Sequence, residues 1–224
     1  MGKPLISDAT MTGMFETMQR LHAVKRQTRT GSRTMRAALQ TEPESLAAAV
    51  LSQMHRRDSL VIEGAQPLFE ASRLSWFADE EAAPSLTTCT GSAEECAAVA
   101  AGMAIKQPHG GSRKPVVVAV LQSFPALTGV LRLMEQHELS LLVIAQGEAE
   151  SRVDANRRMA ATKVPIMPVD DADAVAVCRV MQESMLRARN GWGGAVIHAV
   201  RLPNAPDALE GMRQRMERRG LLGS

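Results

Sequence analysis

Four short apolar runs in the second half of the chain constrain its fold more than any other feature. They cover residues 116–121, 139–145, 165–169 and 195–200, and stretches with helical spacing lie between them. A continuous apolar run bounded by turn residues is typical of a strand that is covered on both faces. Strands that alternate with helices predict an α/β fold, a doubly wound parallel sheet with right-handed crossovers.

The first half adds helices and one short strand to this pattern. Apolar residues recur at helical spacing over residues 11–27, and Thr41 and Pro43 favour a second helix start near residue 44. We expect further helical stretches at 67–77, 93–106, 127–134, 149–161 and 170–190, and a strand at 60–62. The sequence therefore predicts one domain over residues 1–224, with a helical N-terminal extension (1–58), a sheet core (59–203) and a basic C-terminal helix (204–224).

The composition excludes several classes of partner. The chain has 224 residues, a formal net charge of +2 and no tyrosine. Its basic residues gather at 25–36 and 213–219, and such runs are more often solvated helix faces than phosphate sites. Aromatic residues make up only 3%, so the chain lacks the stacking platforms of single-strand binders. We expect no nucleic-acid partner, and an interior built from Ala, Val, Leu and Met.

The cysteines and the hydropathy pattern indicate a cytoplasmic chain. Cys89, Cys96 and Cys178 form no Cys-x-x-Cys pair and are odd in number, which favours reduced thiols over a disulfide framework. Cys96 and Cys178 lie in helical stretches, where we expect them to pack as small apolar residues. No stretch approaches the roughly 20 apolar residues of a membrane span, so we expect no membrane partner.

Several common catalytic and phosphate-binding motifs are absent from the sequence. There is no P-loop, no HExxH and no GxSxG, and the glycines at 191–194 follow a helical stretch where a dinucleotide fingerprint follows a strand. His198 lies inside the last apolar run, where we expect a structural role. Doubly wound sheets bind ligands beyond the carboxyl ends of their strands, so the loops after residues 121, 145, 169 and 200 are the places to search.

The order and character of the segments resemble one family, over roughly residues 14–203. The resemblance is carried by Ala-Ala-Gly-Met-Ala at 100–104, the strands at 115–121 and 139–145, Val-Asp-Asp-Ala-Asp-Ala-Val at 169–175, Ser-Met-Leu-Arg-Ala-Arg-Asn-Gly at 184–191 and Gly-Ala-Val-Ile-His-Ala-Val at 194–200. In these segments the chain resembles the α subunit of thiamine-diphosphate-dependent 2-oxo acid dehydrogenases, the decarboxylating component of such complexes. The resemblance implies a thiamine-diphosphate-binding-like sheet, which would hold the cofactor with Mg²⁺.

The cofactor motif of that family is degenerate in this chain. The family holds Mg²⁺ and the diphosphate with Gly-Asp-Gly after one buried strand and Asn-Asn after the next, because the cation prefers oxygen ligands and glycine permits close approach. The corresponding positions here are Gln122, Ser123 and Phe124, then Gly147 and Glu148. Ser123 replaces the aspartate, and we expect Phe124 to intrude on the diphosphate space. The family's Tyr-Arg diphosphate contact is also missing around residues 63–66.

Three functions follow from this comparison of motifs. The first is a non-catalytic homologue of the α subunit that needs no cofactor and acts as a structural or regulatory partner, in a homo-oligomer or with a β-type dehydrogenase subunit. The second is a divergent active subunit, completed by a β-type partner, with Gln122, Ser123, Gly147 and Glu148 lining a reshaped thiamine diphosphate and magnesium site. The third is a binding module for an anionic metabolite. The sequence predicts the first and assigns no catalytic residue and no metal ligand.

Overall fold

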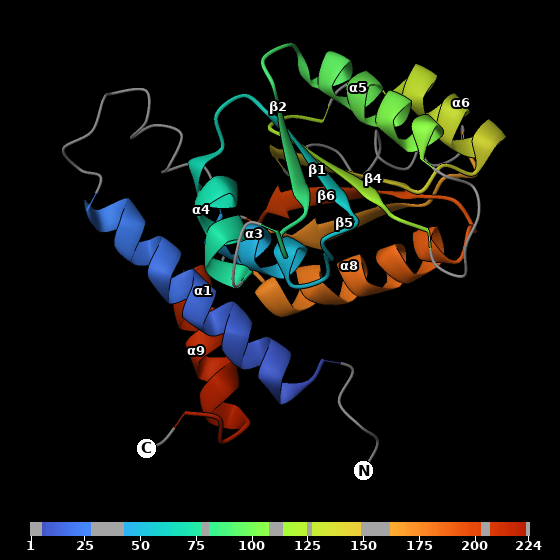
Figure 1. Ribbon diagram of the computed structural model, residues 1–224. Coiled ribbons are helices and arrows are strands. Elements are labelled where there is room, and N and C mark those ends of the chain that lie inside the picture. Colours follow the sequence, from blue (N-terminus) through green and yellow to red (C-terminus); the bar gives the residue numbers. More distant parts are fainter. Residues whose placement is uncertain are drawn as a thin grey trace.

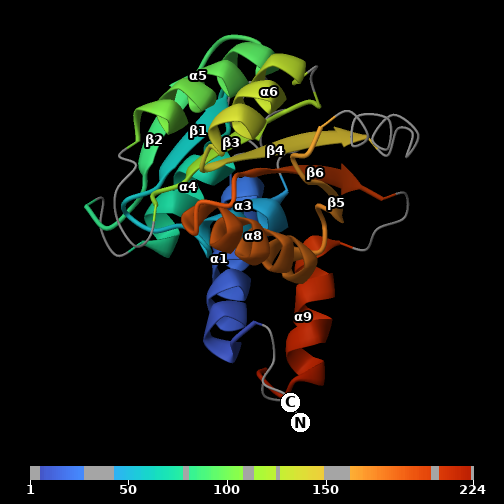
Figure 2. The same ribbon diagram turned by 90° about the vertical axis from the view of Figure 1, so that its right-hand side faces the viewer.

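The chain forms a six-stranded parallel sheet with helices on both faces (Figures 1 and 2). The structure, a computed structural model, describes residues 6–27, 43–77, 81–107, 114–124, 127–148, 162–202 and 207–222. Its strands are β1 (Ser59–Glu63), β2 (Ser85–Cys89), β3 (Val117–Leu121), β4 (Leu141–Glu148), β5 (Ile166–Asp170) and β6 (Ala195–Arg201). Its helices are α1 (Asp8–Gln27), α3 (Glu44–Leu51), α4 (Pro67–Trp76), α5 (Ala93–Lys106), α6 (Thr128–His137), α8 (Ala174–Arg189) and α9 (Ala208–Arg218).

The strand order is β2-β1-β3-β4-β6-β5, and every neighbouring pair is parallel. This confirms the predicted fold class, an α/β doubly wound parallel sheet. The strand order reverses between β1 and β3. From β1 the chain passes to β2, at one edge of the sheet, whereas from β3 it passes to β4, toward the opposite edge. The predicted helix at 149–161 lies outside the described residues, and so do Thr41 and most of the basic segment 25–36.

Alternate residues of the central strands point into two separate cores. The methionine-rich side, formed by α1, α3, α4, α8 and α9, takes Leu60, Ile62 and Val118 from the sheet. It contains buried Met11, Met14, Met18, Met54, Met181, Met185, Met212 and Met216. The alanine-rich side, formed by α5 and α6, takes Val61 and Val117 from the sheet. It contains buried Ala93, Ala97, Ala100, Ala101 and Ala104.

The helices of the methionine-rich side are stacked in more than one layer. Helices α3 and α8 pack against each other below the sheet, and α1 packs on α3, α4 and α9 (Figure 1). Every residue of α3 from Ser45 to Leu51 is buried. Whether residues 1–58 form an extension separate from the core stays a prediction, but α3 itself lies inside the packed layer. No helix in the described part of the chain is long and apolar enough to cross a membrane.

Local sequence explains where several elements begin and end. Helix α5 begins with a capping box, in which the Ser92 hydroxyl accepts from the Glu95 N–H and the Glu95 carboxylate accepts from the Ser92 N–H at 2.7 Å. Helix α8 begins after Asp173, whose carboxylate accepts from two N–H groups of the first turn. Gly191 follows α8 with φ of 77°, as the left-handed position after a helix requires. Strand β2 was not predicted, because its polar, partly exposed Ser-Leu-Thr-Thr-Cys carries no apolar pattern.

Candidate functional site

The carboxyl ends of β1 and β3 form the crevice in which a doubly wound sheet is expected to bind a ligand. The two strands are hydrogen-bonded neighbours, and the helices that follow them, α4 and α6, cover opposite faces of the sheet. Neighbouring strands whose crossovers diverge leave an open crevice at their ends. Gly64, with φ of 62°, turns the chain away immediately after β1.

The chain's own carboxylate occupies this crevice. Glu63 ends β1, and its Oε2 accepts a hydrogen bond from the Gln122 N–H at 2.7 Å. The Gln122 side chain in turn donates from Nε2 to the Glu63 carbonyl oxygen at 3.2 Å. A backbone N–H at the end of a parallel strand is the kind of donor that an anionic ligand uses in such folds. Here that donor is already bonded to a negative group.

A buried amide joins the ends of three strands beside this contact. The Gln66 side chain is fully buried, and its Nε2 donates to the carbonyl oxygens of Glu63 and Val120, both at 3.1 Å. Its Oε1 lies 3.5 Å from Nε2 of Gln146, at the end of β4. Sequence reasoning missed this role. The available signal was a polar residue between Gly64 and Pro67, at the junction of a buried strand and a helix.

Phe124 lies over the end of β4, against a histidine from β6. Its ring centroid is 4.5 Å from that of His198, with the planes tilted by 58°. A Cβ on Gly147 would lie 3.0 Å from Nε2 of His198 and 3.8 Å from Cβ of Phe124. The small residue at 147 is therefore needed for the aromatic pair to fit. Sequence reasoning gave His198 a structural role and expected Phe124 to fill space here, but it did not predict that the two rings pair.

The four predicted site residues converge only in part. Gln122 and Gly147 lie at the same edge of the sheet, one bonded to Glu63 and the other beneath the Phe124–His198 pair. Ser123 is exposed between Gln122 and Phe124. Glu148 ends β4, and its side chain lies outside the described part of the structure. The structure therefore places Gln122 and Gly147 at the carboxyl ends of β3 and β4, and a shared site formed by the four positions stays a prediction.

These residues do not fit thiamine diphosphate with Mg²⁺. A diphosphate is strongly anionic, and Glu63 places a carboxylate on the N–H at the end of β3. Mg²⁺ that is bound with a phosphate ligand takes one or two protein carboxylates, and the residue after Gln122 is the neutral, exposed Ser123. The Phe124 ring lies where the family has glycine. No catalytic step is derived through this cofactor.

Two cysteines lie at the end of β2, next to this edge. Cys89 ends the strand, and the buried Cys96 lies in the first turns of α5 with its Sγ 3.6 Å from the Cys89 carbonyl oxygen. The pKa of the Cys96 thiol is raised to about 12, chiefly by burial and then by the hydrogen bond with the Cys89 side chain and the charges of Cys89, Glu63 and Glu95. A thiol with this pKa stays protonated near neutral pH. Cys96 is therefore a buried apolar residue, as expected, and no thiolate nucleophile.

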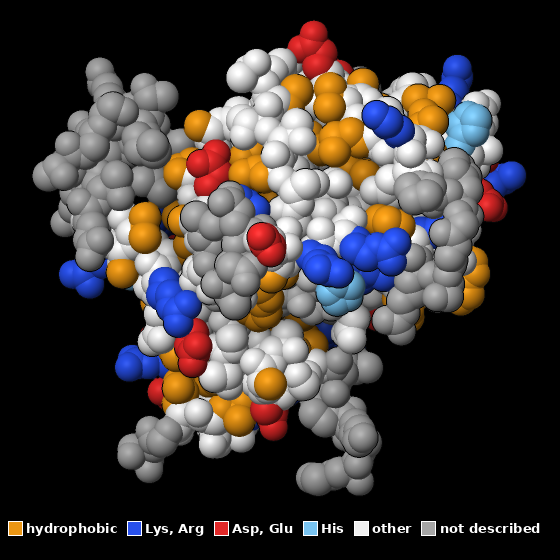
Figure 3. Space-filling model, viewed as in Figure 1, with side chains coloured by type: hydrophobic (Ala, Val, Ile, Leu, Met, Phe, Trp, Pro, Cys, Tyr) orange, Lys and Arg blue, Asp and Glu red, His pale blue; other side chains and the backbone are white. Residues whose placement is uncertain are grey.

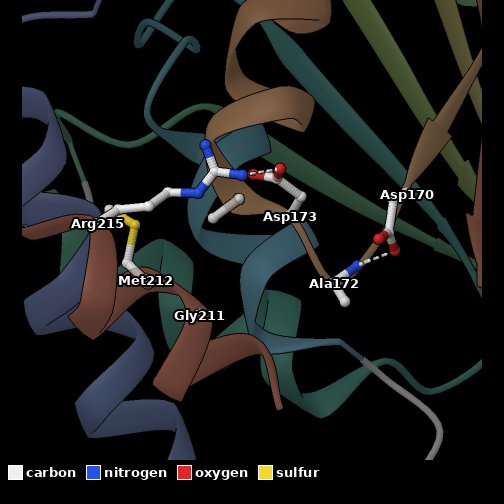
Figure 4. Close-up of a pocket in the computed structure, with 7 residues that line it drawn as sticks. Asp170, Ala172, Asp173, Gly211, Met212 and Arg215 are labelled. Atoms are coloured by element: carbon white, nitrogen blue, oxygen red, sulfur yellow. Dashed lines mark hydrogen bonds and ion pairs between the residues drawn. The ribbon is translucent and has the colours of Figure 1, made fainter. Parts of the chain in front are cut away.

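The end of β5 carries a cavity with paired charges (Figure 4). It has a volume of about 250 Å³ and is lined by Asp170, Ala172, Asp173, Ala174, Gly211, Met212 and Arg215. Arg215 reaches from α9 to form an ion pair with Asp173, as Figure 4 shows. Asp170 accepts from the Ala172 N–H at 3.0 Å. The carboxylates of this cavity already hold partners from the same chain.

Asp171, between Asp170 and Asp173, is buried and connects the β5–α8 turn to Arg201 and Ser45. Its Oδ1 lies 2.5 Å from Nε of Arg201, and its carbonyl oxygen accepts from the Ser45 hydroxyl. Burial raises the pKa of the Asp171 carboxyl, and the Arg201 hydrogen bond and charge oppose that rise. The sequence predicts a helix that begins at Asp170 and Asp171. Asp173 takes that role instead, because β5 continues to Asp170.

The C-terminal basic run is engaged within the chain. Besides the Arg215 pair, Arg219 lies 3.4 Å from Asp8 and donates to the Ile6 carbonyl oxygen at 3.2 Å. Arg213 lies 3.8 Å from Glu217 on the same helix. These contacts tie α9 to α8 and to the start of α1, which agrees with a solvated helix face better than with a phosphate site.

The fold defines a doubly wound α/β protein whose own side chains contact one another at the carboxyl ends of β1, β3 and β4. No family model matches the sequence, and no curated protein matches it. Among solved structures, the chain is similar to a candidate thiamin diphosphate-dependent enzyme from Mycobacterium smegmatis, with a TM-score of 0.49 and 17% sequence identity. The match covers 70% of this chain and 32% of that one, so this chain spans less than half the length of that protein. The fold class rests on this chain's own sheet and not on that likeness.

Proposed function

We propose that this chain is a non-catalytic, cofactor-free relative of the α subunit of thiamine-diphosphate-dependent 2-oxo acid dehydrogenases, and that it acts as a structural or regulatory partner in an oligomer. The order of its segments supports the relationship. The observation that carries the loss of chemistry is the 2.7 Å hydrogen bond from the Gln122 N–H to the Glu63 carboxylate, at the crevice where a diphosphate would bind.

The energetic argument uses the same contact. To admit a diphosphate, the crevice would have to release the Glu63 carboxylate and place two negative groups close together. Losing one charge-assisted hydrogen bond costs about 1.5–3 kcal/mol, and each 1.4 kcal/mol weakens binding about tenfold. Displacement of the Phe124 ring from His198 adds to that cost. We expect the two costs together to weaken binding of the cofactor.

Calorimetric titration of the purified chain with thiamine diphosphate and Mg²⁺ tests the proposal. We expect no heat of binding and no rise in Tm. A ligand at a hundred times its Kd stabilises a protein by about 2.7 kcal/mol, so even modest binding would be visible. Saturable, magnesium-dependent binding with one-to-one stoichiometry would contradict the proposal.

A rebuilt variant makes the test sharper. Glu63→Gln, Ser123→Asp and Phe124→Gly together remove the competing carboxylate, supply a metal ligand and clear the space above Gly147. We expect this variant to bind the Mg²⁺ complex more tightly than the natural chain does. Glu63→Gln with Phe124→Leu is the matched control, because it removes the charge and keeps the space filled, and we expect no gain from it.

The active-subunit alternative has its own readout. Mixing this chain with a β-type dehydrogenase subunit, thiamine diphosphate and Mg²⁺ would give decarboxylation of a 2-oxo acid if a partner completed the site. Loss of that activity in Ser123→Ala would then assign the pocket. The anionic-metabolite alternative draws less support, because the arginines of α9 are held by Asp173, Asp8 and Glu217.

A further inference from the structure

The outer face of α5 is apolar and open to solvent. Val99 and Ile105 are 42% and 43% exposed, and Ala98 and Gly102 on the same helix are also exposed. In Figure 3 hydrophobic side chains gather over α5, between an acidic group at one end of the helix and a basic group at the other. Single exposed apolar residues are ordinary, whereas a continuous apolar face marks an interaction surface.

These residues share one side of the helix. At 3.6 residues per turn, the exposed side chains fall within about a third of the helix circumference. Apart from Glu94, which is exposed at the border of this side, they are Glu95, Ala98, Val99, Gly102, Ile105 and Lys106. All of the residues between Glu95 and Lys106 are uncharged. The half-buried Met103, Leu131 and Leu133 continue the apolar surface toward α6, which packs beside α5.

Among the described residues, Gly102 has no packing partner that explains the glycine. A Cβ at this position would meet no atom within 4 Å, so the monomer has space for a larger residue. Glycine in the interior of a helix is destabilising relative to alanine. A glycine on an exposed, apolar helix face lets a second backbone approach closely.

We infer that the outer face of α5 is a two-fold interface with a second copy of this chain, in which the two α5 helices pack antiparallel. The charged residues at the two ends of the helix and the Val99–Gly102 pair are consistent with the same two-fold axis. The midpoint between Glu95 and Lys106 coincides with the midpoint between Val99 and Gly102. A two-fold axis there pairs Glu95 with Lys106 of the second copy and places Val99 over Gly102 of the second copy, twice by symmetry.

A parallel arrangement of the two α5 helices does not pair opposite charges. It would set Glu95 against Glu95 and leave Lys106 facing Lys106, and like charges repel. The antiparallel arrangement also opposes the two helix dipoles. Glu95 keeps its hydrogen bond from the Ser92 N–H at 2.7 Å, which holds the carboxylate at the helix start where Lys106 of the second copy arrives. This inference goes beyond the proposed function and does not rest on it, because a chain that binds the cofactor would present the same face.

Sedimentation equilibrium of the full chain over a wide concentration range tests the interface. We expect the natural chain to be a dimer and Gly102→Arg to be a monomer. The variant fits the isolated fold because the space around Gly102 is open, and retained circular dichroism checks this. Leu186→Arg is the matched control, since Leu186 is 58% exposed on α8 at the opposite face of the sheet, and it should stay dimeric. A monomeric natural chain, or a Gly102→Arg dimer, would overturn the inference.

A charge variant tests the antiparallel arrangement separately. Lys106→Glu would face Glu95 of the second copy and should weaken the dimer at least tenfold, with the largest loss at low salt. Arg179→Glu makes the same charge change on the exposed part of α8 and should leave the dimer unchanged. Equal dimerisation by the two variants would overturn the antiparallel pairing.

Discussion

The two faces of the sheet are covered in different ways. The methionine-rich side has α3 and α8 against the strands, with α1 and α9 packed outside them. Within the described residues, the alanine-rich side has α5 and α6, and the helix α5 lies close to the strands because its inward residues are alanines. One side thus buries long, flexible side chains under several helices, and the described helices of the other side form a single layer (Figure 2).

This difference concerns function as well as packing. Methionine fills irregular space and tolerates change, so a multilayered side can accept new helices without precise fit. Alanines leave no spare volume and specify one distance between helix and sheet. An exposed apolar helix face marks an interaction surface. The proposed interface with a second copy is therefore on α5 and not on α8.

The largest effect is expected from emptying the methionine-rich side. Phe69 on α4 is fully buried there, and Phe69→Ala should lower the free energy of unfolding by about 3–5 kcal/mol, because it removes a large apolar group and leaves a cavity. Urea unfolding measures this. Trp192→Ala is the control, since Trp192 is 63% exposed and its removal should change stability by less than about 0.5 kcal/mol.

Adding volume should separate the two sides. Ala100 is fully buried between α5 and the sheet, and Ala100→Leu should cost about 1–3 kcal/mol because the backbone has to move. Met18→Leu, at a fully buried position of the methionine-rich side, should cost less than about 1.5 kcal/mol because the volume is conserved. Equal losses in the Tm of both variants would show that the two cores do not differ in their tolerance.

A smaller effect is expected at the start of α5. Ser92→Ala removes the hydroxyl half of the capping box and should destabilise the chain by about 1 kcal/mol. Asp173→Ala, the equivalent change for α8, also removes the ion pair with Arg215 and should cost more. Thermal unfolding of the two variants, compared at one pH, ranks the two helix starts. A larger loss from Ser92→Ala would contradict the expected order.

The smallest effect is confined to alkaline pH. The pKa of Cys96 in the folded chain, about 12, lies above its ordinary value of 9.0, so the folded state holds this proton more tightly than the unfolded state does. The stability is therefore complete below pH 9 and falls as the pH rises from 9 toward 12. Cys96→Ala should flatten that fall and leave the slope at neutral pH unchanged, as measured by urea unfolding at each pH.

The cysteine on the methionine-rich side provides the comparison. Burial also raises the pKa of Cys178, but hydrogen bonds with Ser52 and Gln53 oppose the rise. Cys178→Ala should therefore flatten the alkaline fall less than Cys96→Ala does. The opposite ranking would mean that burial and the Cys89 contact do not hold the Cys96 proton more tightly than the proton of Cys178 is held.

Local sequence patterns predicted most of the helices and strands. Continuous apolar runs predicted β3, β4, β5 and β6, and helical spacing predicted α1, α4 and α5, because the burial of one face or of both leaves a periodic signal. Strand β2 was not predicted, because an edge strand of polar, partly exposed residues has no apolar pattern. The loop residue Asp58, at the end of the predicted N-terminal extension, is buried and pairs with Arg189 at 2.6 Å. A partner so distant in sequence leaves no local trace.

The sequence by itself determined the fold class and the absence of a Gly-Asp-Gly stretch after β3, because both depend on residue types at neighbouring positions. Glycine and aspartate are missing after β3 whatever the tertiary structure is. Only the tertiary structure decided what fills the crevice. The Glu63 carboxylate on the Gln122 N–H, the Gln66 amide and the Phe124–His198 pair join residues of different strands, and their contacts depend on a strand order that no local pattern encodes.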